Sequence, residues 1–172
     1  MHIAYIGAGS NMNSQNGGPP ENLKQAACAL EKKFSLGPGQ MRASSIYWTE
    51  PQLVKEQPWF ANQVFELRIA RMMRSVECLE ILQETERELG RAQCGIRYGP
   101  RLIDLDLLLF DQEISSSTVL TLPHPRLAER AFVLVPLTEL AVDLELPGFG
   151  RTGEQMLASL AYRLDGIRIL QA

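Results

Sequence analysis

Apolar and polar positions along the chain divide it into short strands and helices. Alternation or short apolar runs predict strands, and apolar residues repeating every three or four positions predict helices. The expected strands are 2–7, 42–49, 60–70, the apolar part of 99–110, 118–122 and 166–170, and the expected helices are 20–34, 75–89, 131–141 and 153–162. This order predicts an α+β sandwich whose strands pair mostly antiparallel, with the helices packed on one side.

Two aspartates interrupt the most apolar of these strands. Strands disfavour Asp, yet Asp104 and Asp106 stand two residues apart within GPRLIDLDLLLF. Alternation places both carboxylates on one face, opposite Ile103, Leu105, Leu107 and Leu109. Two partly buried carboxylates repel each other unless a cation or hydrogen-bond donors compensate, which favours a divalent metal such as Mg²⁺. A solvent-facing strand edge is the alternative.

Composition and length limit the classes of protein that fit. The 172 residues, 45% of them hydrophobic, suit a single domain spanning 1–172, and no segment has the run of apolar residues that a membrane span requires. The absence of a signal-peptide pattern predicts a cytoplasmic protein. Cys28, Cys78 and Cys94 form no CxxC pair, so neither a disulfide nor a zinc site is expected.

Charge points to an anionic small molecule rather than to nucleic acid. The formal net charge is −3, and no basic stripe is evident. Arg91 and Arg101 nevertheless approach the aspartate strand, and Arg126 and Arg130 follow it. Arginine grips phosphate in a bidentate manner, so aspartates, Mg²⁺ and arginines together predict phosphoryl transfer.

Several ordered blocks resemble the 6-hydroxymethyl-7,8-dihydropterin pyrophosphokinase family of folate synthesis. The resemblance covers nearly the whole chain and rests on AYIGAGSN, SSIYWTEPQ, QPWFANQVFEL, LQETERELGR, RYGPRLIDLDLLLFD and LPHPRLAERAFVLVPL. It implies a ferredoxin-like sandwich and transfer of pyrophosphate from ATP to the pterin alcohol with release of AMP. It also implies that Asp104 and Asp106 hold two Mg²⁺ ions against the ATP phosphates.

The resemblance implies roles for further residues on the nucleotide side. Arg91 and Arg101 match arginines that bind phosphates and assist the transfer. The expected ATP contacts are Gln83, Glu86, Leu107, Thr121, His124 and Arg130. By pattern alone, Gln83 and Glu86 are more typical of a solvent-facing helix surface than of a nucleotide site.

The same resemblance implies a pterin side. The expected substrate contacts are Asn11, Thr49, Pro51, Gln52, Phe60, Asn62, Tyr98 and Phe132. Asn62 can offer an amide to the edge of the ring, and Phe60 and Phe132 can sandwich it. Both phenylalanines could equally be core residues.

Two other classes of function stay open on the residues alone. A palm-type nucleotidyl transferase would use the aspartate pair and two metals to attack the α-phosphorus, and it would release pyrophosphate. A non-catalytic ferredoxin-like module would only bind nucleotide or metal. The expected partners are ATP and the pterin, with no nucleic acid and no membrane, and a monomer is the expected state.

Overall fold

Seven strands form a central sheet in the computed structural model, which describes residues 1–51, 56–70, 72–90 and 99–171. The strand order is β10-β11-β3-β4-β1-β5, and β2 also pairs with β4. Their bounds are β1 His2–Ser10, β2 Met41–Ala43, β3 Tyr47–Thr49, β4 Phe60–Ile69, β5 Asp104–Phe110, β10 Tyr162–Asp165 and β11 Arg168–Gln171. Every pairing in this sheet is antiparallel except that of β11 with β3. The predicted α+β class and mostly antiparallel sheet are confirmed.

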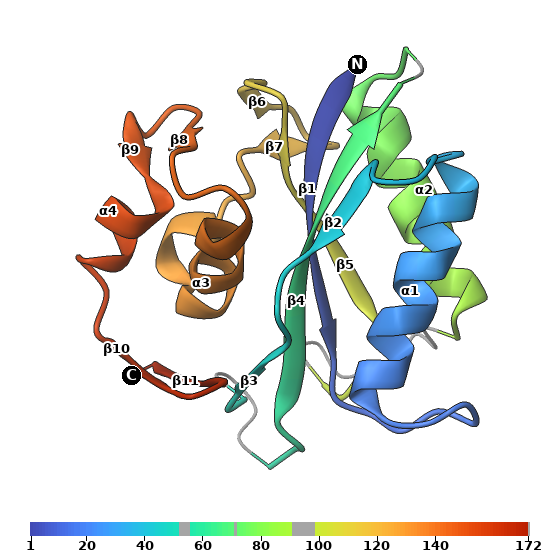
Figure 1. Ribbon diagram of the computed structural model, residues 1–172, viewed down its shortest axis with the longest axis vertical. Coiled ribbons are helices and arrows are strands. Elements are labelled where there is room, and N and C mark those ends of the chain that lie inside the picture. Colours follow the sequence, from blue (N-terminus) through green and yellow to red (C-terminus); the bar gives the residue numbers. More distant parts are fainter. Residues whose placement is uncertain (52–55, 71, 91–98, 172) are drawn as a thin grey trace.

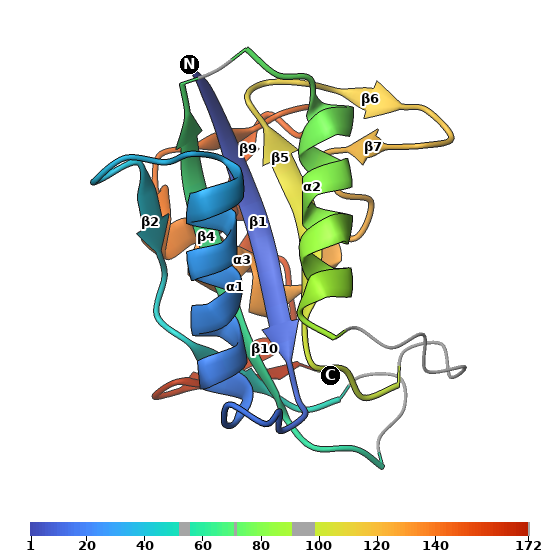
Figure 2. The same ribbon diagram turned by 90° about the vertical axis from the view of Figure 1, so that its right-hand side faces the viewer.

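Helices cover both faces of the sheet, so the prediction that they pack on one side is wrong. Helices α1 (Pro19–Lys33) and α2 (Ser75–Glu88) lie on one face, and α3 (Ala131–Leu140) and α4 (Gly153–Leu157) lie on the other (Figures 1 and 2). The reason is that the central strands are apolar on both sides. Phe65 of β4 packs toward α1 and α2, whereas its neighbour Val64 packs toward α3.

The aspartate strand keeps the predicted division of faces over its first half. Leu105 and Leu107 belong to the core shared with α1 and α2. Asp104 and Asp106 point to the opposite face, where they are partly exposed. Strand β5 is the last strand of the sheet, so this face ends at an edge.

A β-bulge at Leu108 changes the second half of this strand. The register with β1 shifts between Tyr5 and Ile6, and Leu109 consequently packs toward α3 together with Leu108. The expectation that Leu109 shares a face with Leu105 is therefore wrong. The carbonyl of Leu108 accepts a hydrogen bond from the backbone N–H of His124 (2.9 Å), so the irregularity in β5 holds the segment that carries this histidine.

Three other predicted elements differ from the observed ones. The strand expected at 42–49 splits into β2 and β3 because Ser44 Oγ, rather than a backbone carbonyl, accepts the N–H of Val64 (3.0 Å). The last helix ends at Leu157, and the final strand is half of a hairpin that turns at Gly166, where φ is +57°.

Smaller elements complete the face that carries α3. Strands β6 (Ser115–Ser116) and β7 (Thr121–Leu122) pair with each other, as do β8 (Glu145–Leu146) and β9 (Arg151–Thr152), and a 3₁₀ turn spans Leu127–Glu129. In the described part of the chain, none of the helices has both the length and the apolar character that crossing a membrane requires.

Candidate active site

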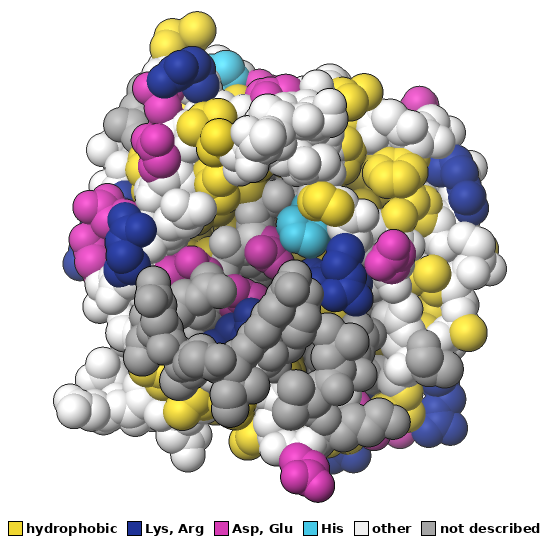
Figure 3. All heavy atoms as spheres, turned by 180° about the vertical axis from the view of Figure 1, so that it is seen from behind, with side chains coloured by type: hydrophobic (Ala, Val, Ile, Leu, Met, Phe, Trp, Pro, Cys, Tyr) yellow, Lys and Arg dark blue, Asp and Glu magenta, His cyan; other side chains and the backbone are white. Residues whose placement is uncertain are grey.

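A cavity of about 420 Å³ opens on the α3 face, where β1, β3, β4 and β5 approach residues 124–133. It brings together nine of the residues predicted from the sequence, from six separate segments. They are Thr49, Phe60, Asn62, Arg101, Asp104, Asp106, His124, Arg130 and Phe132. Seen from behind the view of Figure 1, one histidine lies beside basic and acidic side chains near the middle of the surface (Figure 3).

The two aspartates line the cavity with unequal surroundings. Arg101 Nη1 lies 2.6 Å from Asp104 Oδ2, a charge-assisted hydrogen bond. The contacts of Asp106 with described basic side chains are longer: its Oδ2 lies 3.7 Å from Arg130 Nη1 and 3.8 Å from His124 Nε2. Burial, and then the negative charge of Asp104, raise the pKa of Asp106 above its usual range. Asp106 therefore carries negative charge that the surrounding protein does not fully balance.

His124 presents a defined nitrogen to this carboxylate. The N–H of Arg126 donates to its Nδ1 at 3.2 Å, which requires that nitrogen to be unprotonated. Burial lowers the pKa of His124, so the ring is neutral near pH 7, with its proton on Nε2. The imidazole thus points an N–H toward Asp106 and into the cavity.

Arg130 stands beside His124 at the start of α3. Burial lowers the pKa of its guanidinium, although arginine stays charged at physiological pH. Its Cζ lies 5.4 Å from the centre of the Phe132 ring. Arg101 lies over Phe60 in the same way, at 5.7 Å. Both arginines are thus held between an aromatic ring and a carboxylate.

Across β1 from the aspartates, strand β4 brings an amide, Asn62, to the cavity, which the rings of Phe60 and Phe132 also line. Asn62 Nδ2 donates to Thr49 Oγ1 (2.8 Å) and to the carbonyl of Phe60 (3.2 Å). Because both amide protons bind protein atoms, Asn62 offers a ligand its oxygen as an acceptor. A Cβ on Gly9 would lie 3.4 Å from that oxygen, so glycine keeps the approach to it open.

The remaining predicted residues lie outside the described lining of the cavity. Asn11 and Glu86 are buried and bind other protein groups, Leu107 packs in the core toward α1 and α2, Pro51 is buried, and Gln83 and Thr121 are exposed. Arg91, Gln52 and Tyr98 lie outside the residues that the structure describes.

Asn11 and Glu86 hold the walls of the cavity in place. Asn11 donates to Gln57 Oε1 (3.0 Å) and the carbonyl of Pro58 (3.1 Å), and its Oδ1 accepts the N–H of Arg101 (2.8 Å). Glu86 Oε1 accepts the N–H of Leu105 (2.7 Å), the residue between the two aspartates.

Sequence reasoning missed several residues of the lining. Glu50 and Gln57 face the cavity, as do Gly7 and Gly9. Only the glycines gave a signal, because the small residues after the first strand predict a close approach of backbone to another group. Gln57 is brought to the cavity by Asn11, a contact that no local pattern contains.

The donor set fits a hard divalent cation supplied with a phosphate ligand. Among the described residues, no group of three or more His, Cys, Asp or Glu side chains could enclose a metal by itself. Two carboxylates on one strand face, one of them with a raised pKa, match the one or two protein carboxylates typical of Mg²⁺ bound with substrate phosphates.

Comparison with known proteins agrees with this geometry. The model of the 7,8-dihydro-6-hydroxymethylpterin-pyrophosphokinase (HPPK) family matches residues 5–142. A 2-amino-4-hydroxy-6-hydroxymethyldihydropteridine pyrophosphokinase of Bacillus subtilis is 39% identical over 144 residues, 84% of this chain and 81% of the relative. The protein of the same name from Pseudomonas aeruginosa is 36% identical over 166 residues, covering 96% of this chain and 95% of the relative.

Solved structures share the fold. A crystal structure of HPPK-DHPS in complex with substrates gives a TM-score of 0.67 at 13% identity, and Plasmodium falciparum HPPK-DHPS with pteroate gives 0.68 at 11%. The match covers 98% of this chain but only 47% and 49% of those chains, so this chain spans about half their length. By the family match and the close relatives, the chain belongs to the 7,8-dihydro-6-hydroxymethylpterin-pyrophosphokinase family.

Proposed function

We propose that this protein transfers the pyrophosphoryl group of ATP to 6-hydroxymethyl-7,8-dihydropterin and releases AMP, a reaction of folate biosynthesis. The observation that carries the proposal is that one cavity holds both a group of charged side chains and a separate amide. The charged side chains, Asp104, Asp106, Arg101 and Arg130, suit a metal-bound polyphosphate, and the amide of Asn62 suits a flat heterocycle. Membership of the family supports the same reaction and favours neither alternative class of function.

Asp104 and Asp106 are the proposed ligands of two Mg²⁺ ions. The raised pKa of Asp106 is the sign of negative charge that a cation would balance. Bound there, Mg²⁺ would neutralise charge on the phosphates and act as a Lewis acid at the transferred phosphorus. Arg101, which is paired with Asp104 at 2.6 Å, is then available to a phosphate oxygen.

The basic side chains have the nucleotide as their proposed ligand. Arg101 and Arg130 would bind phosphate oxygens, and His124 would donate its Nε2 proton to one of them. Arg91 is proposed to act on the same phosphates. The proposed nucleotide roles of Gln83, Glu86, Leu107 and Thr121 rest on the resemblance alone.

The pterin would occupy the part of the cavity beside Asn62. Asn62 would accept a hydrogen bond from a ring N–H, with Thr49 holding the amide in that orientation. Phe60 and Phe132 would lie against the faces of the ring. Asn11 would act indirectly, by fixing Gln57 and Arg101.

These positions define the chemistry that the chain would perform. The pterin hydroxyl oxygen forms a bond to the β-phosphorus, the bond between that phosphorus and the bridging oxygen of AMP breaks, and the hydroxyl proton passes to solvent. The residues align the two substrates and stabilise charge on the transferred group, which is most of the catalysis in phosphoryl transfer.

The ferredoxin-like topology, the number of domains, the oligomeric state and the cellular location are part of the same proposal. The order of β3, β4, β1 and β5, with α1 and α2 on one face, is that expected of a ferredoxin-like arrangement. A single domain over 1–172, a monomer and a cytoplasmic location stay predictions from the sequence.

Identification of the nucleotide product tests the reaction. The protein is incubated with ATP, Mg²⁺ and 6-hydroxymethyl-7,8-dihydropterin, and AMP that forms only with the pterin is the expected result. Asp106→Ala should abolish it, whereas Asp143→Ala, an exposed aspartate, should not. Formation of ADP, release of free pyrophosphate or absence of turnover would each contradict the proposal.

A further inference from the structure

The hairpin of β10 and β11 lies beyond residues 5–142, which the family model matches, yet it joins the sheet next to the cavity. Strand β11 runs parallel to β3, with Arg168 opposite Trp48 and Ile169 opposite Thr49. The N–H of Trp48 also donates to the carbonyl of Ile167 at 2.8 Å. The hairpin therefore supports the strand that presents Thr49 to the cavity.

The far end of β11 holds the start of helix α3. Gln171 Oε1 accepts the N–H of Ala131 (2.8 Å), and Gln171 Nε2 donates to the carbonyl of Glu129 (2.6 Å). Arg130, at the N-cap position, makes no capping hydrogen bond with its own side chain. Gln171 thus performs the capping from a distant part of the sequence.

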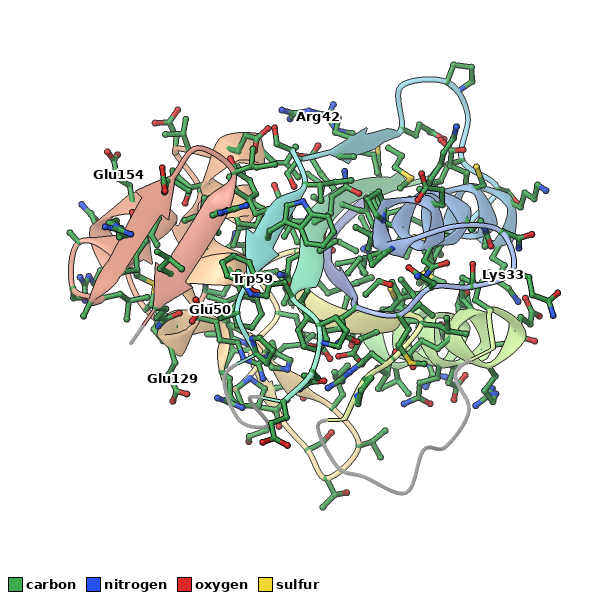
Figure 4. All side chains as sticks on the ribbon, turned by 90° about the horizontal axis from the view of Figure 1, so that it is seen from below. Lys33, Arg42, Glu50, Trp59, Glu129 and Glu154 are labelled. Atoms are coloured by element: carbon green, nitrogen blue, oxygen red, sulfur yellow. The ribbon has the colours of Figure 1, made fainter. Side chains whose placement is uncertain are left out.

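The residues on either side of this cap line the cavity. Arg130 lies near Asp106, and Phe132 follows Ala131 in the first turn of α3. At the near end of β11, the guanidinium of Arg168 lies 5.5 Å from the centre of the Trp59 ring, which precedes Phe60. Trp59 and Glu129, the two places that β11 reaches, are labelled in Figure 4.

We propose that β11 is a positioning element of the active site, in which Gln171 fixes the first turn of α3 and so orients Arg130 toward the phosphates of ATP. The inference rests on the proposed function. Without the cap, the end of the helix frays, and ATP must order it on binding. The consequence is a weaker apparent affinity for ATP rather than a slower chemical step.

Matched glutamine variants of the full chain test this role. Gln155 caps α4 with the same chemistry, because its Oε1 accepts the N–H of Thr152 at 3.0 Å, and it is not in the lining of the cavity. Gln171→Ala should raise the KM for ATP about 3- to 10-fold, the size expected from the loss of one cap, with kcat changed less than about twofold. Gln155→Ala should leave both constants within about twofold of wild type.

Two further variants separate positioning from general loss of structure. Gln171→Glu keeps an acceptor for the N–H of Ala131 but loses the donor to the carbonyl of Glu129, so it should raise the KM for ATP less than Gln171→Ala does. Gln171→Lys keeps only a donor and should resemble Gln171→Ala. If Gln171→Ala does not fold, the KM values for ATP of Gln171→Glu and Gln171→Lys are compared with each other instead. In an Arg130→Ala background, Gln171→Ala should change the KM for ATP less than about twofold, because the residue that it orients is gone.

The inference is overturned if Gln171→Ala leaves the KM for ATP unchanged, if Gln155→Ala raises it equally, or if the effect persists without Arg130. A wild-type protein that forms no AMP from ATP and pterin would overturn the proposed function together with this inference. An active wild-type protein with an unaffected Gln171→Ala variant would overturn the inference alone.

Discussion

Glu86 carries a sharp prediction about how the aspartates are held in place. Strand β5 lies at the edge of the sheet, so the N–H of Leu105 that points away from β1 has no further strand to pair with. Glu86 Oε1 accepts this N–H at 2.7 Å, and Leu105 stands between Asp104 and Asp106. Both Glu86 and Leu105 are buried, at 5% and 4% exposure, so water cannot readily replace the carboxylate.

Replacing Glu86 with alanine should lower the free energy of unfolding by about 2–4 kcal/mol, because a hydrogen bond to a charged group is lost and a buried N–H is left without an acceptor. Glu86→Gln retains an amide oxygen as acceptor and should lose only about 1 kcal/mol. Glu80→Ala makes the same truncation at an exposed position of the same helix and should lose less than about 0.5 kcal/mol.

Urea unfolding of the three variants measures these differences, and Mg²⁺ dependence of AMP formation measures the functional effect. We expect Glu86→Ala to need more Mg²⁺ for half-maximal activity, since the strand between the two proposed ligands is no longer held. The reasoning is refuted if Glu86→Ala is no less stable than Glu80→Ala. A variant Glu86→Gln of normal stability but with a raised KM for ATP would indicate direct contact with nucleotide instead.

Three other substitutions test the electrostatics and the cavity wall. The pKa of Asp106 is raised, so the stability that its protonated form contributes is present at low pH and is lost as pH rises through the native pKa. In urea unfolding without metal, Asp106→Asn should therefore be more stable than wild type at neutral pH, and this difference should shrink as pH falls. Burial raises the pKa of Tyr5 to about 12, so between pH 10 and 12 wild type should lose about 2 kcal/mol more of its free energy of unfolding than Tyr5→Phe, as followed by urea unfolding at high pH. Asn11→Ala should lower the free energy of unfolding by about 2–4 kcal/mol and raise the KM for the pterin, while exposed Asn16→Ala should do neither.

The part of the site that follows from local alternation could be predicted from the sequence. Asp104 and Asp106 lie on one face of β5 because neighbouring side chains alternate, whatever surrounds the strand. Alternation failed at Leu109, since the bulge at Leu108 depends on a register with β1 that no local pattern specifies. Phe60 and Asn62, which were expected from the resemblance, reach the cavity because β4 pairs with β1. That pairing is also a long-range contact, which no local pattern specifies.

The placement of helices was harder to predict. Short apolar runs are equally consistent with burial on one face or on two, and β4 is covered on both, with Phe65 and Val64 in different cores. The final strand, expected at 166–170, is confirmed as β11, but its partner β10 was missed because all four residues of β10 are at least partly exposed. The pairing of β11 with β3 joins residues more than a hundred positions apart in the chain.

The charges around the cavity have a consequence for how binding depends on ionic strength. Among the described lining residues, three carboxylates (Glu50, Asp104 and Asp106) face three guanidinium groups (Arg101, Arg126 and Arg130), and the imidazole is neutral. ATP carrying two divalent cations is likewise close to neutral. Because neither the cavity nor ATP with two Mg²⁺ ions carries a large net charge, binding depends on short-range contacts and little on long-range attraction. The affinity for ATP should therefore vary little with added monovalent salt while Mg²⁺ is saturating. When Mg²⁺ is scarce, ATP is an anion that the carboxylates of Asp104 and Asp106 repel, so its affinity should fall because the metal is missing, and added salt should not be the cause.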